Sequence, residues 1–242
     1  MIHSFTFNGI NTEKYGLYVG GQNTFKAPQR DVTKVSIPGR NGDLVRDNGR
    51  FLNTPIAYTI VAMKDFAETA TAVQNWLMSV KGYARLEDTY HPDYFRIARV
   101  SDTITFETSA YNLTGKAQIV FDCQPQKFLK TGENAIKILK NDPVESRTIV
   151  NPTLFDSKPL IRVYCTGSGT ITVGNQIITI SNVTGYVDID CETQNCYNES
   201  VNCNNKVTLG AQGFPVLPSG DTTFEMTGDV TKIEVTGRWW SL

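Results

Sequence analysis

Hydrophobic and polar residues alternate with a period of two along most of this 242-residue chain. Every second residue from Ile56 to Ala62 is apolar, and the stretches 95–98 and 117–121 behave similarly. Such alternation is typical of β-strands that bury one face. The sequence therefore predicts a mainly β protein.

One segment has helical periodicity instead. From Phe66 to Val80, apolar residues recur at steps of four and three, which places them on one side of an α-helix. Asp65 is a suitable N-cap for this helix, and Gly82 is a suitable stop signal. Because a lone helix among strands must bury its apolar stripe, we expect it to cover a sheet.

The last part of the chain is predicted to consist of short strands separated by turns. Gly174-Asn175 has the composition of a two-residue hairpin turn, and the polar, Asn-rich stretch 192–206 is predicted to be a surface loop. Strands at this spacing favour a β-sandwich. The predicted strands are 160–165, 170–173, 176–180, 186–191, 207–209, 222–226 and 232–236.

Turn-forming pairs such as Thr-Gly and Asn-Pro interrupt residues 124–159. Short apolar pieces at 135–139 and 148–150 could still pair as strands. We therefore predict a domain boundary that leaves residues 1–148 in an N-terminal domain and residues 149–242 in a C-terminal domain.

A turn between two strand-like stretches stands out in the N-terminal part. Val35 and Ile37 alternate with polar neighbours, which predicts a half-buried strand leading into the turn. A planar guanidinium at the tip could bind a carboxylate or carbonyl groups of a partner. On the hexapeptide alone, an ordinary surface hairpin with a solvated arginine is the simpler interpretation. The turn reads Pro38, Gly39, Arg40, Asn41, Gly42, Asp43.

Composition and charge exclude several classes of protein. Hydrophobic residues make up 40% of the chain and charged residues 19%, which is typical of a globular protein with a core. The net charge of −1 lacks the polybasic signature of nucleic-acid binding. No apolar run approaches the roughly 18 residues that span a membrane, and we find no secretory signal. We therefore expect folding in a reducing cytosol and no membrane partner.

The five cysteines invite a metal hypothesis, because Cys191, Cys196 and Cys203 lie close together in sequence. Their spacing differs from the paired C-x2-C knuckles of a zinc ribbon, and no histidine follows His91. An odd number of cysteines without an export signal also argues against a disulfide framework. We expect buried or loop thiols, with no metal and no cofactor.

Catalytic motifs are missing from the sequence, which has no nucleophile elbow, phosphate loop, dinucleotide fingerprint or zinc-protease helix. Two carboxylate clusters could suit a glycosidase pair, and the second could also suit calcium. In the second cluster, we favour a solvated sheet face, because alternation along a strand already accounts for the residues. We therefore predict that the protein is not an enzyme. The clusters are Glu87-Asp88 with Asp93, and Asp188-Asp190-Glu192.

A series of landmarks runs in order along nearly the whole chain. They are Ile37–Leu44, Asn75–Leu77, Leu86–Tyr94, Phe121–Pro125, Asn151–Thr153, Lys158–Ile161, Asp188–Glu192, Gly213–Gly220 and Arg238–Leu242. In this order and spacing the landmarks resemble the distal tail protein (Dit) family of siphophages that infect Gram-positive bacteria, which is also found in prophages.

The resemblance implies a β-barrel-like N-terminal domain with one helix and a galectin-like C-terminal β-sandwich. It also implies a homo-hexameric ring that joins the tail tube protein to the tail-associated tip protein. DNA and the tape-measure protein would pass through its central channel, and in relatives receptor-binding proteins are further partners. The ring would be assembled in the host cytoplasm and lie at the virion tail tip. Under this interpretation, residues 38–43 are a candidate contact with a neighbouring subunit or the tube.

Trp239 and Trp240 allow three interpretations. They could pack into the core or against the N-terminal domain, or they could form a platform on which a sugar stacks. Because adjacent tryptophans near a chain end are seldom left exposed, we favour packing. The platform belongs to an alternative function, a carbohydrate-binding host-adsorption module that acts through the C-terminal sandwich. A cell-wall-degrading enzyme is a second alternative.

Overall fold

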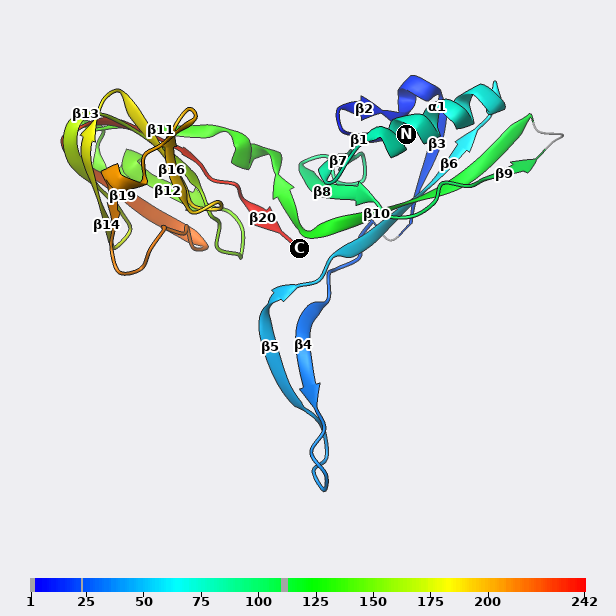
Figure 1. Ribbon diagram of the computed structural model, residues 1–242, viewed down its shortest axis with the longest axis horizontal. Helices are drawn as coiled ribbons and strands as arrows, with labels where there is room; N and C mark the ends of the chain where they lie inside the picture. The colour runs from blue at the N-terminus through cyan, green and yellow to red at the C-terminus, as the bar shows by residue number, and fades with distance from the viewer. Residues whose placement is uncertain (1–2, 23, 110–112) are drawn as a thin grey trace. The chain divides into compact units, whose positions relative to one another are not determined.

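The computed structural model describes residues 3–22, 24–109 and 113–242 (Figure 1). The chain divides into two compact units: Met1–Lys127 together with Leu242, and Phe128–Ser241. In the described residues, strands dominate and one α-helix is present, which confirms the expected mainly β class. None of the described helices is long and apolar enough to cross a membrane.

The division falls earlier than the boundary that the sequence suggested. Strand β11 (Ala135–Leu139) pairs with β19 (Gly220–Thr236) and places Ile138 in the buried core of the second unit. The turn-rich region after residue 127 therefore already belongs to the C-terminal unit, because its short apolar pieces pair there as strands.

The first unit is built on one large sheet, whose strands follow the order β2-β1-β7-β8-β10-β6-β3, with β9 also paired to β10. Strands β4 and β5 form a separate two-stranded sheet. Barrel-like closure of the large sheet stays a prediction. The elements are β1 (Phe5–Phe7), β2 (Ile10–Asn11), η1 (Thr12–Tyr15), β3 (Leu17–Gln22), β4 (Arg30–Val35), β5 (Leu44–Phe51), β6 (Thr54–Ala62), α1 (Phe66–Ser79), β7 (Ala84–Asp88), β8 (Tyr94–Val100), β9 (Phe106–Ser109) and β10 (Thr114–Leu129).

Strand β6 and helix α1 carry the first core, as the two periodicities predicted. Ile56 and Ile60 of β6 are completely buried, and Val73 and Leu77 of α1 belong to the same cluster. Asp65 occupies the N-cap position but makes no side-chain capping bond, because its own backbone is left-handed with φ 45°. The helix ends at Ser79, before Gly82.

The second unit contains the remaining strands. Apart from β20, which pairs with β10, they follow the order β11-β19-β13-β15-β16-β17, while β12 also pairs with β19, and β14 pairs with β13 and β18. The elements after β10 are η2 (Lys130–Glu133), β11, η3 (Val144–Arg147), β12 (Thr148–Asn151), β13 (Leu160–Val173), β14 (Gln176–Val183), β15 (Tyr186–Asp190), β16 (Asn195–Asn198), β17 (Val201–Asn202), η4 (Asn204–Lys206), β18 (Val207–Leu209), β19 and β20 (Trp240–Ser241).

Two long strands, β13 and β19, pair along most of their length. Their register shifts between Cys165 and Gly169, where Gly169 lies opposite Gly228. A Cβ atom on Gly169 would lie 2.4 Å from the carbonyl oxygen of Thr227, so the two backbones approach each other closely only because both residues are glycine. Strands that bend in this way can change sheets without ending.

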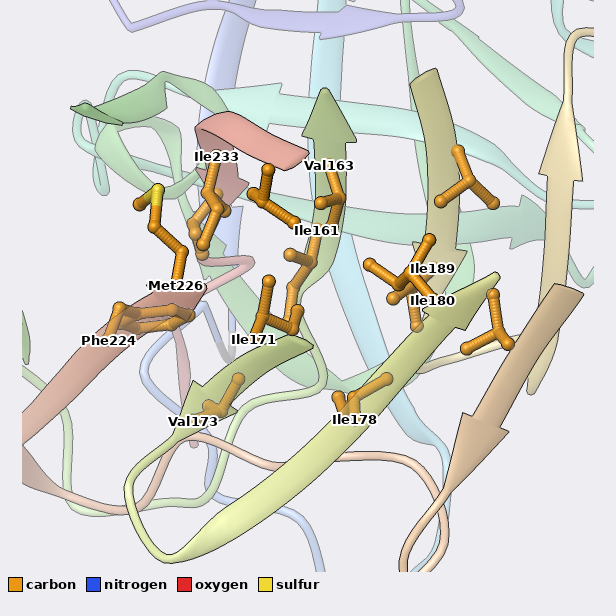
Figure 2. Close-up of a cluster of buried hydrophobic side chains, with 14 of the residues drawn as sticks. Ile161, Val163, Ile171, Val173, Ile178, Ile180, Ile189, Phe224, Met226 and Ile233 are labelled. Carbon is orange, nitrogen blue, oxygen red and sulfur yellow. The ribbon is translucent and has the colours of Figure 1, made fainter. Parts of the chain in front are cut away.

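Both ends of this ladder supply side chains to one apolar core (Figure 2). Ile161, Val163 and Ile233 come from one end of the ladder, and Ile171 and Phe224 come from the other. All five side chains are at most 1% exposed. The unit is therefore held by a shared core, as expected of a sandwich; its galectin-like character stays a prediction.

The stretch 192–206 is not only a loop. It contains β16, β17 and η4, and it buries the side chains of Cys196 and Cys203 in the core of the second unit. The prediction of a polar surface loop is wrong here, because the side chain of Cys196 in β16 is buried while the other three side chains of this strand are only partly buried.

Candidate functional site: an exposed hairpin arm

Strands β4 and β5 and the turn that joins them form a ribbon, residues 30–51, which we call the arm. Its antiparallel register pairs Val35 with Leu44, Lys34 with Val45 and Thr33 with Arg46. In Figure 1 the arm extends away from β3 and β6, the strands that precede and follow it. An isolated two-stranded ribbon gains little from burial, so its shape must come from turn geometry and local pairs.

The apolar side chains of the arm lie in solvent. Val35 is 47% exposed, Leu44 49% and Val45 55%, and Ile37 is exposed as well. The prediction of a half-buried strand leading into the turn is therefore wrong, because no other described element covers either face of the ribbon. Exposed apolar residues grouped in this way mark interaction surfaces.

The tip of the arm begins with a type II turn. The amide of Arg40 donates to the carbonyl oxygen of Ile37 at 3.1 Å, with Pro38 at the second position and Gly39 at the third. Gly39 has φ +80°, the value that this turn requires and that glycine reaches without strain. The sequence thus fixes the direction in which the tip presents its side chains.

Polar pairs stiffen the arm below its tip. Asp31 accepts from Arg50 Nε at 2.6 Å and from Asn48 Nδ2 at 3.0 Å, while Arg30 and Asp47 pair at 3.2 Å. The hydrogen bond from Asn48, and then that from Arg50, lower the pKa of Asp31. These cross-strand pairs lie in solvent, so they favour the ribbon geometry without contributing much stability.

Several charged side chains of the arm do not form such cross-strand pairs. Among the described residues, the side chains of Lys34, Arg40, Asp43 and Arg46 have no ion-pair partner, and all four are exposed. The tip therefore offers both signs of charge beside exposed apolar groups, and this combination suits a protein partner.

The base of the arm is anchored to the first unit on both sides. Before β4, Arg96 Nη2 donates to the carbonyl oxygen of Thr24 at 2.9 Å, and both residues are buried. After β5, Asn53 Nδ2 donates to Tyr83 Oη at 2.7 Å and to Asp122 Oδ2 at 3.1 Å. The arm is therefore an exposed extension with a fixed root.

The two tryptophans lie in packing positions within the second unit. Trp239 is 4% exposed and belongs to the core, and its carbonyl oxygen accepts the amide of Leu129 at 2.8 Å. The indole of Trp240 stacks on Phe155 with ring centroids 4.4 Å apart and donates to the carbonyl oxygen of Asp156 at 2.9 Å. Both indoles thus have partners within the unit, and a glycan platform stays a prediction.

The carboxylates of the first cluster have structural partners. Asp88 accepts from Tyr58 Oη at 2.5 Å and from the amide of His91 at 2.8 Å. Burial, reinforced by the charge of Asp88, raises the pKa of Tyr58. Glu87 pairs with Arg85 at 2.6 Å, and Asp93 is exposed. The arrangement orients a buried tyrosine and a turn.

The second carboxylate cluster, Asp188-Asp190-Glu192, does not lie on a solvated sheet face as expected. Asp188 is 2% exposed and Asp190 5%, so the predicted solvated face is in fact closed over by arginines. Arg162 donates to both oxygens of Asp188 at 2.7 and 2.8 Å, and Arg238 donates to both oxygens of Asp190 at 2.7 and 3.1 Å. Glu192 is exposed. Within the described residues, no cluster of three or more His, Cys, Asp or Glu side chains is arranged to hold a metal ion.

The mainly β fold of this chain has matches among solved structures of phage adsorption and baseplate proteins. The fold matches the crystal structure of the SPP1 Dit protein, described as a paradigm of the hub adsorption apparatus of phages that infect Gram-positive bacteria, with a TM-score of 0.75, 14% identity and full coverage of both chains.

Chains of the phage p2 baseplate in its activated conformation, with strontium or with calcium, also match. Their TM-scores are 0.52 and 0.51 at 9% identity, and the match covers 97% of this chain and 98% of each of those chains. No protein-family model and no curated protein matches the sequence. The resemblance to distal tail proteins is thus confirmed at the level of the fold.

Proposed function

We propose that this protein is the structural hub at the tip of a long, non-contractile phage tail. Six copies close a ring that joins the tail tube protein to the tail-associated tip protein. The match to the SPP1 Dit protein over the full length of both chains carries this proposal, because it includes both units. The location that follows is the virion tail tip, after assembly in the host cytoplasm.

The arm is the part of the chain best suited to hold neighbouring copies together. A ring requires two different surfaces on each subunit, one that reaches out and one that receives. The arm reaches out from a fixed root, and burying the exposed halves of Val35, Leu44 and Val45 in a neighbour contributes about 1 kcal/mol each. Residues 38–43 then lie at the subunit or tube contact.

The near-neutral chain is compatible with a channel through which DNA passes. Phosphate binding strengthens with each Lys or Arg that a protein engages, and strong binding would retard passage. The net charge of −1 avoids such retention. The tape-measure protein would use the same channel, and receptor-binding proteins are further candidate partners. The proposal includes no catalytic role.

Molar mass measured by light scattering across a concentration series tests the ring. We expect a mass that rises toward six subunits, with open rings in negative-stain images. A monomer at every concentration would contradict the ring and would favour the alternative, a carbohydrate-binding adsorption module.

Two variants with similar exposure test the arm. Val45 is 55% exposed on the arm, and Ile177 is 59% exposed on β14 of the second unit. Val45→Asp should raise the concentration at which half of the protein is assembled by at least about tenfold, because a charge would enter the contact. Ile177→Asp serves as the control and should leave it unchanged. Equal effects of the two variants would remove the arm from the interface.

A further inference from the structure

Cys196 and Cys203 face each other across the edge of the second unit. Strands β16 and β17 pair Tyr197 with Asn202 and Asn198 with Val201. The next rung of this ladder is formed by the two cysteines, and the amide of Cys203 donates to the carbonyl oxygen of Cys196 at 2.7 Å. The backbone register therefore places Cys196 and Cys203 directly opposite each other.

This position suits a covalent link between the two sulfur atoms. Residues that are hydrogen-bonded across antiparallel strands have Cα atoms about 5.5 Å apart, which lies inside the range of about 4.4–6.8 Å that disulfides occupy. Opposed residues also project from the same face of a ladder. Both side chains enter the same buried cluster, with exposures of 2% and 4%.

The third cysteine nearby occupies a less suitable position. On the other side of β16, Cys196 lies opposite Ile189 of β15, not opposite Cys191. Cys191 follows the end of β15, so it can approach Cys196 only diagonally. The register therefore selects Cys203 as the partner of Cys196 and leaves Cys191 as a thiol.

Access to the pair comes from the edge of the sheet. Strand β17 has only two residues and ends the strand order, and its first residue, Val201, is 66% exposed. Short edge elements open locally much more often than a whole unit unfolds. Burial, and then the charge of the neighbouring Cys203, raise the pKa of Cys196 to about 11. Reaction near neutral pH is therefore slow and accelerates as the pH rises.

We propose that Cys196 and Cys203 are a redox-sensitive pair that forms a disulfide on exposure to a glutathione-type disulfide. One cysteine thiolate attacks a sulfur of oxidised glutathione, which forms a mixed disulfide and releases one glutathione thiolate. The second cysteine, as its thiolate, then displaces the other glutathione. One S–S bond is broken and one is formed, two protein thiols are oxidised, and their two protons end on two molecules of reduced glutathione.

Alkylation and peptide mapping of the full chain test the pair. Reduced protein is incubated with oxidised glutathione in mildly alkaline buffer, then denatured in the presence of excess iodoacetamide so that buried thiols are alkylated too, and digested. We expect the number of alkylated thiols to fall from the five that the chain contains to three. One disulfide-linked species should join the peptides that contain Cys196 and Cys203. A link from Cys196 to Cys191, or five remaining thiols, would overturn the proposal.

Serine variants give matched controls. Cys191→Ser should still lose two thiols, whereas Cys203→Ser should form no link between two protein cysteines and should lose at most one thiol, as a mixed disulfide of Cys196 with glutathione. If Cys203→Ser loses two thiols as well, the selected pairing is wrong. Mapping of the unsubstituted chain decides the question even if a variant fails to fold. The readout does not depend on ring assembly, so its failure is distinguishable from failure of the hub proposal.

Discussion

The arm and the ladder formed by β13 and β19 are both antiparallel ribbons, yet they use their side chains in opposite ways. In the ladder, apolar residues such as Ile161 fill a shared core, and outward charges are paired, as in Arg162 with Asp188. In the arm, apolar residues such as Leu44 lie in solvent and Arg40 has no ion-pair partner among the described residues. The side chains of the ladder thus find their partners within their own unit, whereas the arm leaves apolar and charged side chains available for another molecule.

Removal of a core side chain should show this contrast most strongly. Ile161→Ala is expected to lower the free energy of unfolding by about 2–5 kcal/mol, because Ile161 is fully buried. Leu44→Ala in the arm should change it by no more than about 0.5 kcal/mol. Urea unfolding followed by tryptophan fluorescence measures both variants. Similar losses would show that the arm is packed within its own subunit.

Removal of a carboxylate should give the next largest difference. Asp188→Ala leaves the partly exposed guanidinium of Arg162, on the outward face of the ladder, without its bidentate partner, and we expect a loss of about 2 kcal/mol. Asp47→Ala breaks the exposed pair with Arg30 and should cost less than about 1 kcal/mol. The same urea titration measures the free energy of unfolding of both variants. A larger loss for Asp47→Ala than for Asp188→Ala would contradict the expected difference between the arm and the ladder.

Acid should destabilise the second unit through Asp190. Burial alone would raise its pKa, but hydrogen bonds from Arg238 and from the amides of Thr193 and Glu192 hold it below the usual value. The stabilisation is therefore present above the unfolded pKa of about 3.9 and is lost as the pH falls through the lower folded pKa. Between neutral pH and about pH 3, the free energy of unfolding should fall less steeply for Asp190→Asn than for the original protein. Identical slopes for the two proteins would contradict this role of Asp190.

The smallest effect is expected at the tip of the arm. Gly39→Ala forces a Cβ onto a residue at φ +80°, which loosens the turn while the two cores stay intact. Hydrogen exchange of the Arg40 amide should accelerate, and the midpoint of global unfolding should stay within error of the original protein. An unchanged exchange rate would indicate that the turn is held by something besides its own hydrogen bond.

Period-two alternation was sufficient to predict most strands, because each core needs one buried face per strand. Alternation did not predict the length of β13. The sequence suggested two strands with a break at residues 166–169, whereas in the structure β13 continues through these residues. Glycine clusters usually end strands, but here Gly169 lies opposite Gly228, and the two together allow a bend. Such opposition is a property of two strands far apart in sequence, so no local pattern reveals it.

The candidate site shows a second limit of sequence patterns. Alternation at Val35 and Ile37 identifies which residues share a face, but it cannot tell whether anything covers that face. The turn at residues 38–43 was recognisable from Pro-Gly and Asn-Gly alone. The root of the arm was missed, although an arginine at an inward position of an alternating strand, Arg96, was an available signal.

The first and last segments of the second unit lie side by side, since the amide of Leu129 donates to the carbonyl oxygen of Trp239 and that of Arg238 to the carbonyl oxygen of Gly132. A unit whose entry and exit meet can be inserted into a host chain without separating the flanking residues. The second unit is thus suited to insertion into otherwise unrelated proteins, and its own chain could be circularly permuted. Evolution could replace it, or extend its loops, without disturbing the sheet from which the arm projects.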